Sequence, residues 1–419
     1  MTQEDAKSII NAYNGGVVPR KDLLANLVVG RGKLLNAIKQ ILEDTANGGS
    51  IMKFLIGDPG FGKTCIMYLT TLSAWAKGFV TMTADFTAER RLYDGGSGKA
   101  LALYKALMDS VSIKTRPRGG ALPVILEVGI NNIITGMAVE KGMEKARLMD
   151  SENMGLVMDE IDKRLAEVDG IDSADFNSVV KSYFRGFLLK DSILKNDAIK
   201  WLSGGFRSLI EARQKLDIRN IVDDSNWYSM LKNFCAFTVH VGHFKGLTIL
   251  LDEAACICEI VGKDIRDKNI EKVKFLYNDC SQHRCDHMFI LMAGTRNFRD
   301  NKMRGLCSNE HMRSRLEENE YAKNGMIDYS GPELPLDPLD RDSALLLFER
   351  LKPVFDTRYE IDLPLSKENI IVFRNALYKD ESRRAFLSPR KVAMKFFDLM
   401  ETMRQNNKSF SEVFNGFEQ

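Results

Sequence analysis

Three features that mark other classes of protein are missing from this sequence. The formal net charge is only +2, from 59 basic and 57 acidic residues, so no overall excess of charge favours a nucleic-acid or membrane surface. Seven cysteines, without the paired spacing of secreted domains, favour a reducing compartment over a disulfide framework. The N-terminus carries acids and amides where a signal peptide has a basic end and an apolar run. We therefore expect a cytoplasmic protein that is not exported.

Long apolar runs are also scarce. The most apolar stretch, Ala121 to Ile134, is interrupted by Pro123, Glu127 and two asparagines, and it is shorter than the roughly 20 residues that span a bilayer. We therefore expect no membrane anchor. A chain of 419 residues that is 44% hydrophobic can bury a sizeable core, and its length favours two or three structural units.

Short apolar runs alternate with Gly-rich turns and helical patterns. Met52 to Ile56 is followed by a Gly-rich turn and then by helical spacing from Cys65 to Trp75. Gly78 to Ala84 follows as a second strand, which predicts a βαβ unit of a parallel sheet with buried strands. Leu247 to Leu251 and Met288 to Ala293 are two further apolar runs, each followed by polar residues. In open α/β sheets the carboxyl ends of such strands carry function.

One glycine-rich segment matches the P-loop pattern G-x-x-x-x-G-K-[ST]. It consists of Gly57, Asp58, Pro59, Gly60, Phe61, Gly62, Lys63 and Thr64. It lies directly after a predicted strand and before a predicted helix, a context that disfavours a chance Gly-rich turn. Backbone amides of such a loop surround the β-phosphate of a nucleotide, while Lys63 neutralises phosphate oxygens and the Thr64 hydroxyl binds Mg²⁺. We also assign Gly30, Arg31 and Cys65 to the ATP site.

The predicted strand at Leu247–Leu251 ends in two carboxylates. Asp252 is suited to hold the Mg²⁺ shell, and Glu253 is suited to polarise the attacking water. A protein that only binds nucleotide has no need of the second acid, so the pair favours hydrolysis. The alternative is that the two acids cap the following helix, since acids are favoured at helix N-termini.

Five further residues are candidates for the same chemistry. Thr295 and Asn297, just past the Met288–Ala293 strand, are placed to reach a γ-phosphate or its water, although an ordinary polar turn is the alternative. Arg313 and Arg315 lie where AAA+ ATPases place a trans-acting arginine, and a solvated helix face is the alternative. Arg390 opens a predicted helix and could contact the γ-phosphate in cis or lie on the surface.

Four potential zinc ligands crowd into one short stretch: Cys280, His283, Cys285 and His287. Structural zinc sites usually draw their ligand pairs from two separated loops, whereas this stretch leads straight into a core strand. We therefore favour buried cysteines and surface histidines.

The spacing of these motifs predicts the organisation of the chain. The stretch between Thr64 and Asp252 is far longer than a minimal P-loop core needs, so a large insertion must lie there. We expect an α/β P-loop NTPase of the AAA+ type with a parallel sheet, a helical insertion and a C-terminal α-helical lid. The predicted parts are 1–99 (core with the P-loop), 100–240 (mainly helical insertion), 241–335 (rest of the core) and 336–419 (lid).

Beyond the P-loop, several segments carry a resemblance to a known family. They are Gly16–Pro19, Trp201–Gly204, Ile221–Trp227, Gly294–Phe298, Arg304–Leu306, Met312–Leu316 and Ser388–Arg390. With them, nearly the whole chain resembles the BREX-system ATP-binding proteins of the BrxC/BrxD family, in the short BrxD-like form. One departure is Cys256-Ile257-Cys258 after the acids, which should leave catalysis untouched.

The resemblance implies an AAA+ fold, an intracellular setting and a role in bacterial defence against phage. It implies ATP and Mg²⁺ as cofactors, and as partners other defence proteins such as helicase or methyltransferase components, DNA, and further copies of the chain. Two other functions stay open. One is a nucleotide-dependent DNA-binding loader or transposition-type regulator, disfavoured because little chain follows Arg390, and the other is a signalling NTPase switch that needs no DNA.

Overall fold

The chain forms two compact units in the computed structural model. The first comprises Met1–Ile38, Leu55–Thr70 and Glu333–Gln419, and the second comprises Lys39–Phe54 and Thr71–Pro332. The structure describes residues 1–15, 17, 19–20, 23, 27–317, 319–322, 326–379 and 387–415. Gly16 and Val18, which belong to the first segment of the family resemblance, lie outside the described residues.

Five strands form one parallel sheet in the order β2-β3-β4-β1-β5. Their bounds are β1 (Ser50–Ile56), β2 (Val80–Asp85), β3 (Leu247–Asp252), β4 (Met288–Gly294) and β5 (Glu333–Pro335). Residues of β3 and β4 are buried throughout, as expected for strands covered on both faces. The four strands that the apolar runs predict are all present, and only the short β5 lacks a signal in the sequence.

The register of the sheet places two acidic residues side by side at the ends of β2 and β3. Strand β2 pairs parallel with β3 so that Asp85 stands beside Asp252, and β3 pairs parallel with β4 so that Leu247 stands beside Met288. The outer edge of β2 is covered by a short antiparallel bridge, in which Thr81 and Ser112 exchange backbone hydrogen bonds of 2.9 Å. This pairing protects an edge strand that would otherwise offer free N–H and C=O groups.

Helices alternate with the strands along the chain, as expected for an α/β core. They are α3 (Gly32–Ala46), α4 (Lys63–Ala76), α5 (Lys99–Asp109), α12 (Trp227–His240), α13 (Cys256–Glu259), α14 (Lys263–Ser281), α15 (Arg296–Asp300), η2 (Leu306–Ser308) and α16 (Glu310–Arg315). The long amphipathic α14 buries Ile270, Val273 and Leu276 on one face.

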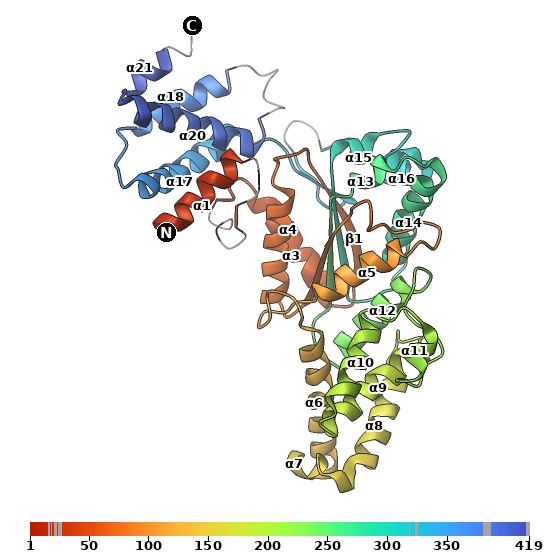
Figure 1. The fold of residues 1–419 in the computed structure, drawn as a ribbon. Helices are drawn as coiled ribbons and strands as arrows, with labels where there is room; N and C mark the ends of the chain where they lie inside the picture. Colours follow the sequence, from red (N-terminus) through yellow and green to blue (C-terminus); the bar gives the residue numbers. More distant parts are fainter. Residues whose placement is uncertain are drawn as a thin grey trace. The chain divides into compact units, whose positions relative to one another are not determined.

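A group of helices separates β2 from β3 in the second unit. It contains α6 (Leu122–Lys141), α7 (Lys145–Leu148), η1 (Ser151–Asn153), α8 (Met154–Ala166), α9 (Ala174–Leu188), α10 (Ser192–Leu202) and α11 (Leu209–Arg213). Helices α6, α8 and α9 pack on one another (Figure 1). In this packing Ile130, Ile134 and Tyr183 lose all contact with solvent.

Helix α6 is the one described helix that is long and apolar enough to cross a bilayer. Its composition also suits the core helix of a folded domain, and 44% of its most apolar window is buried. Ile125, Leu126 and Ile133 face the neighbouring helices and are fully or almost fully buried. The helix is therefore explained by packing within the second unit.

One carboxylate fixes the start of α5. Asp224 accepts hydrogen bonds of 2.7 Å from the backbone N–H groups of Gly98 and Leu101. Since Gly98 offers no side chain to cap the helix, Asp224 supplies the acceptors from a distant part of the sequence. The segment Ile221–Trp227, singled out by the family resemblance, thus has a structural role.

The first unit contains a second helical group, made of α1 (Gln3–Asn14), α17 (Arg341–Tyr359), α18 (Lys367–Leu377), α20 (Pro389–Asn406) and α21 (Phe410–Asn415). The N-terminal helix α1 packs on α17 and α20. Ile9 of α1 is fully buried in the same apolar core as Phe348 and Phe396, whose ring centroids lie 4.4 Å apart in a tilted arrangement. The two ends of the described chain therefore build one core.

Candidate functional site

The P-loop is shaped by backbone geometry that glycine permits. Gly60 and Gly62 have φ of +85° and +94°, values that L side chains rarely adopt. A Cβ on Gly60 would also lie 2.8 Å from Ser388 Oγ. Helix α4 begins at Lys63, so the turned loop leads directly into a helix N-terminus. Such an N-terminus presents N–H groups without intrahelical partners and favours phosphate.

The Lys63 ammonium lies over the loop that it follows. Its Nζ donates to Gly57 O at 2.7 Å and to Asp58 O at 3.4 Å. Carbonyl oxygens thus hold the charge close to the turn where phosphate oxygens are expected. Because the lysine side chain is flexible, we expect its ammonium to exchange these carbonyls for phosphate oxygens when a nucleotide binds.

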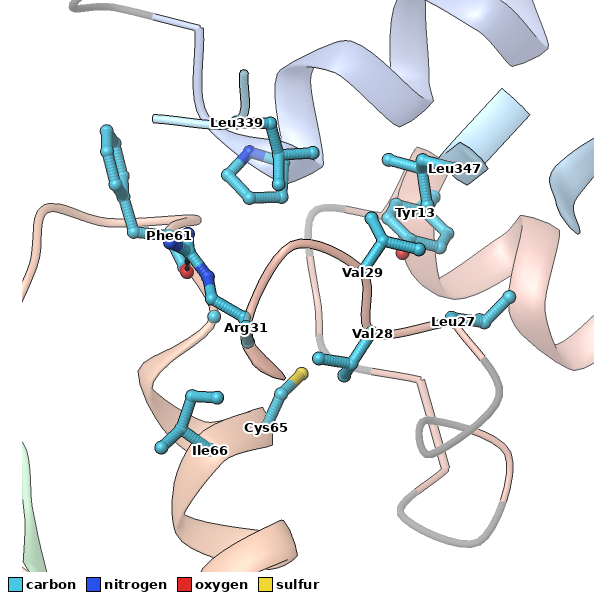
Figure 2. Close-up of a pocket in the computed structure, with 12 residues that line it drawn as sticks. Tyr13, Leu27, Val28, Val29, Arg31, Phe61, Cys65, Ile66, Leu339 and Leu347 are labelled. Atoms are coloured by element: carbon cyan, nitrogen blue, oxygen red, sulfur yellow. Dashed lines mark hydrogen bonds between the residues drawn. The ribbon is translucent and has the colours of Figure 1, made fainter. Parts of the chain in front are cut away.

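A mainly apolar pocket adjoins the P-loop within the first unit (Figure 2). Its cavity volume is about 60 Å³. Its lining includes Tyr13, Leu27, Val28, Val29, Arg31, Phe61, Gly62, Cys65, Ile66, Leu339, Leu347 and Pro389. An apolar pocket with a few polar groups beside a phosphate-binding loop has the chemistry that a nucleotide base and sugar need.

Arg31 connects three parts of this pocket. Its Nη2 donates to Asp337 O at 2.7 Å and to Phe61 O at 3.5 Å. Figure 2 shows the side chain running from the loop after Val29 toward the P-loop residue Phe61. Arg31 therefore holds backbone segments of the pocket together. The sequence predicts a direct contact with the nucleotide, and this structural role was not predicted.

Burial and the charge of one arginine shift the pKa values of two polar groups in the pocket. Burial raises the pKa of the Cys65 thiol to about 11, and the positive charge of Arg390 opposes this shift. Burial also raises the pKa of Tyr13, again opposed by Arg390. Both groups therefore stay neutral at physiological pH. The charge of Arg390 is felt by two residues of the pocket that adjoins the P-loop. The backbone N–H of Arg390 lies 3.4 Å from Gly60 O.

In the second unit, β3 ends at the predicted pair of carboxylates. Asp252 is 7% exposed, and its Oδ1 accepts a 2.8 Å hydrogen bond from the backbone N–H of Glu253. Glu253 is exposed and has φ of +57°, an uncommon value for a residue with a side chain. Such strain is often found at functional sites, because the surrounding fold must maintain it.

Helix α13 follows these acids and has Ala255 as its N-cap, whose own side chain forms no capping hydrogen bond. The alternative interpretation of the acid pair as a helix cap stays open. A third acid, Asp85, stands beside Asp252 in the strand register and was not predicted, although its place at the end of a strand was visible in the sequence.

Thr295 and Asn297 follow β4 as predicted. The Thr295 hydroxyl caps α15 by accepting from the Phe298 N–H at 3.2 Å, and Asn297 Oδ1 accepts from Asn301 Nδ2 at 3.1 Å. Both side chains thus have the local contacts of an ordinary polar turn. The hydroxyl proton of Thr295 is not used by this cap, so its role toward phosphate stays a prediction.

Arg313 and Arg315 lie on the short helix α16 and are both exposed. Among the described residues Arg313 has a 3.9 Å contact with Glu310, whereas Arg315 donates to His311 O at 3.3 Å and lies 5.8 Å from the Tyr277 ring centroid. Which of the two acts in trans stays a prediction.

The cysteine and histidine cluster does not form a metal centre. Within the described residues no group of three or more potential ligands could hold a metal ion. Cys280 and Cys285 are buried with their sulfurs 3.6 Å apart, and Ser50 Oγ lies 2.9 Å from Cys285 Sγ. These contacts support the interpretation of packed cysteines over a zinc site.

Each unit therefore gathers its own part of the predicted machinery. The first unit brings Arg31, Cys65 and Arg390 to the P-loop, and the second places Asp252, Glu253, Thr295 and Asn297 at neighbouring strand ends. The sequence matches the family described as BREX system ATP-binding protein BrxC/D over residues 1–416. The chain belongs to the BrxC/BrxD family. No curated protein and no solved structure matches it.

Membership of the BrxC/BrxD family agrees with the resemblance found in the sequence. The family description names ATP binding, which is the chemistry of the P-loop and its pocket. It also names the BREX system, so other BREX proteins are expected partners. Apolar pocket residues such as Tyr13, Leu339 and Leu347 were missed by the sequence analysis, because only folding brings them together.

Proposed function

We propose that this chain is an AAA+ ATPase that hydrolyses ATP to assemble or switch a BREX defence complex on DNA. The observation that carries the proposal is the P-loop, where two glycines with positive φ lead Lys63 and Thr64 into the start of α4. In this proposal the loop holds the phosphates, the apolar pocket beside Val29 holds the base, and Arg390 contacts the γ-phosphate.

Hydrolysis is assigned to Glu253 and its neighbours. Glu253 takes a proton from the attacking water, while Thr295 and Asn297 orient that water or the γ-phosphate. Thr64 and Asp252 offer a hydroxyl and a carboxylate, which are the oxygen ligands that Mg²⁺ prefers. Mg²⁺ would supply charge neutralisation at the phosphates. The exposed, strained backbone of Glu253 supports a chemical role for this residue.

Arg313 or Arg315 completes the site from a second copy of the chain. Both lie exposed on α16, as a trans-acting residue requires. The proposal therefore includes a homo-oligomer whose active sites lie between subunits. The helices from α17 to α21 serve as the lid, and those from α6 to α11 serve as the insertion.

Three measurements test this proposal. We expect Mg²⁺-dependent release of phosphate from ATP, and a native mass that increases when ATP is added. Hydrolysis that duplex DNA accelerates supports the DNA-linked ATPase over a signalling switch. Tight ATP binding without phosphate release, with or without DNA, would refute the assigned hydrolysis.

A further inference from the structure

A second cavity, separate from the P-loop pocket, lies in the second unit. It has a volume of about 570 Å³ and lies between α14 and the segment after α15. Its lining includes four cations, Lys263, Arg266, Lys302 and Arg304, but only two acids, Asp267 and Glu271. None of the four cations forms an ion pair with a described residue of the chain.

Two of these cations are held close to each other. Arg266 Nη1 donates to Ile260 O at 2.9 Å, and Arg304 Nη2 donates to the same oxygen at 3.1 Å. Arg304 Nε also donates to Cys258 O at 2.7 Å. Two guanidinium groups thus share one carbonyl acceptor without a carboxylate between them. Like charges at this separation repel, so the pair creates a strong local positive potential.

The burial of Arg266 favours binding of an anion beside it. Arg266 is 6% exposed, and its Nε has no hydrogen-bond partner among the described residues. A buried charge is normally paired or bound to an ion, because leaving water is costly. Helix α14 also starts at this cavity with Gly262 as an N-cap that has no capping side chain. Its dipole adds to the positive potential there.

The rim of the cavity indicates the kind of anion. Lys263 and Lys302 are exposed, and beside Lys302 the apolar side chain of Met303 is 80% exposed. An open cavity with exposed cations and an apolar rim suits a phosphodiester and its sugar better than a small enclosed ion. Asp267 and Glu271 lie further along α14 and confine the anion to the basic end.

We propose that this cavity binds a phosphate of a nucleic-acid backbone. The inference deepens the proposed function by placing a DNA contact at Lys263, Lys302 and the arginine pair. The arginines anchor backbone carbonyls, so they fix the positive potential, and the two lysines contact the phosphates. Backbone phosphates carry no sequence information, so the contact is independent of DNA sequence.

The test uses the full chain, a short fluorescent duplex and fluorescence anisotropy over a range of salt concentrations. In the variant with Lys263→Ser and Lys302→Ser, DNA affinity should fall roughly 10- to 100-fold at about 0.1 M salt, and the salt slope should become less steep by about 2. The arginines are kept because their removal could disturb the fold. The matched control, Lys141→Ser with Lys145→Ser, removes two exposed lysines from the helical insertion and should bind DNA like the wild type.

Other outcomes overturn the inference. Wild-type affinity in the Lys263/Lys302 variant, or a wild type that does not bind the duplex, excludes the cavity as a nucleic-acid site. Binding of two ATP equivalents per chain, reduced to one in this variant, would assign the cavity to a nucleotide phosphate. ATP turnover measured on the same samples is independent of these results, so failure of the proposed hydrolysis is recognised separately.

Discussion

The two units prepare their functional groups in different ways. In the first unit the backbone positions the functional groups, because glycines turn the P-loop and carbonyl oxygens hold Lys63. In the second unit side chains restrain the backbone, because Asp224 caps α5 and Arg304 binds the carbonyls that follow Glu253. We therefore expect ATP binding to depend mainly on a local motif, and the proposed hydrolysis to depend on contacts between distant segments.

The largest effect is expected from a change in the first unit. Lys63→Ala removes the charge that offsets the β and γ phosphates, so tight ATP binding should be lost. Titration with a fluorescent ATP analogue measures this effect, and thermal unfolding without nucleotide should be nearly unchanged because Lys63 is only partly buried. An affinity equal to that of the wild type would show that the P-loop does not bind ATP.

A change in the second unit should affect stability instead. Asp224→Ala removes both acceptors from the N-terminus of α5, which should lower the free energy of unfolding by about 1 to 3 kcal/mol. Denaturant unfolding measures this loss. Asp224→Asn is the matched control, because it keeps one acceptor oxygen and should lose less. If both variants unfold like the wild type, the cap does not stabilise the second unit.

The smallest effect is expected at the basic loop after Ile113. Lys114, Arg116 and Arg118 are exposed, and the backbone of this loop is held by a bridge between Ile113 and Arg116. If the loop contacts phosphate, replacing the three cations by serine should weaken DNA binding for all sequences and flatten the salt dependence. Anisotropy titrations with two unrelated duplexes measure this. Unchanged affinity and slope would remove the loop from the DNA contact.

The sequence predicts one part of this architecture better than the rest. The P-loop and the strands around Ile56, Ala84, Leu251 and Ala293 are visible because a motif or an apolar run is local. The pocket beside Val29 and the packing of α1 on α17 were not predicted, because they join segments that are far apart in the sequence.

The arginine pair at Ile260 illustrates the same limit. Arg266 and Arg304 are ordinary charged residues in the sequence, and nothing local indicates that both bind one carbonyl oxygen. Likewise, the left-handed backbone of Glu253 has no signal in residue type. Positions whose geometry depends on tertiary contacts therefore require the structure.

ATP affinity and single-turnover phosphate release, both measured on the Glu253→Gln variant, test the proposed hydrolysis most directly. The amide can hydrogen-bond water but cannot take its proton, so the variant should bind ATP with wild-type affinity and release almost no phosphate in a single-turnover experiment. A role in capping alone would leave turnover intact. If Glu253→Gln hydrolyses bound ATP at the wild-type rate, the assignment of the second unit to catalysis is wrong.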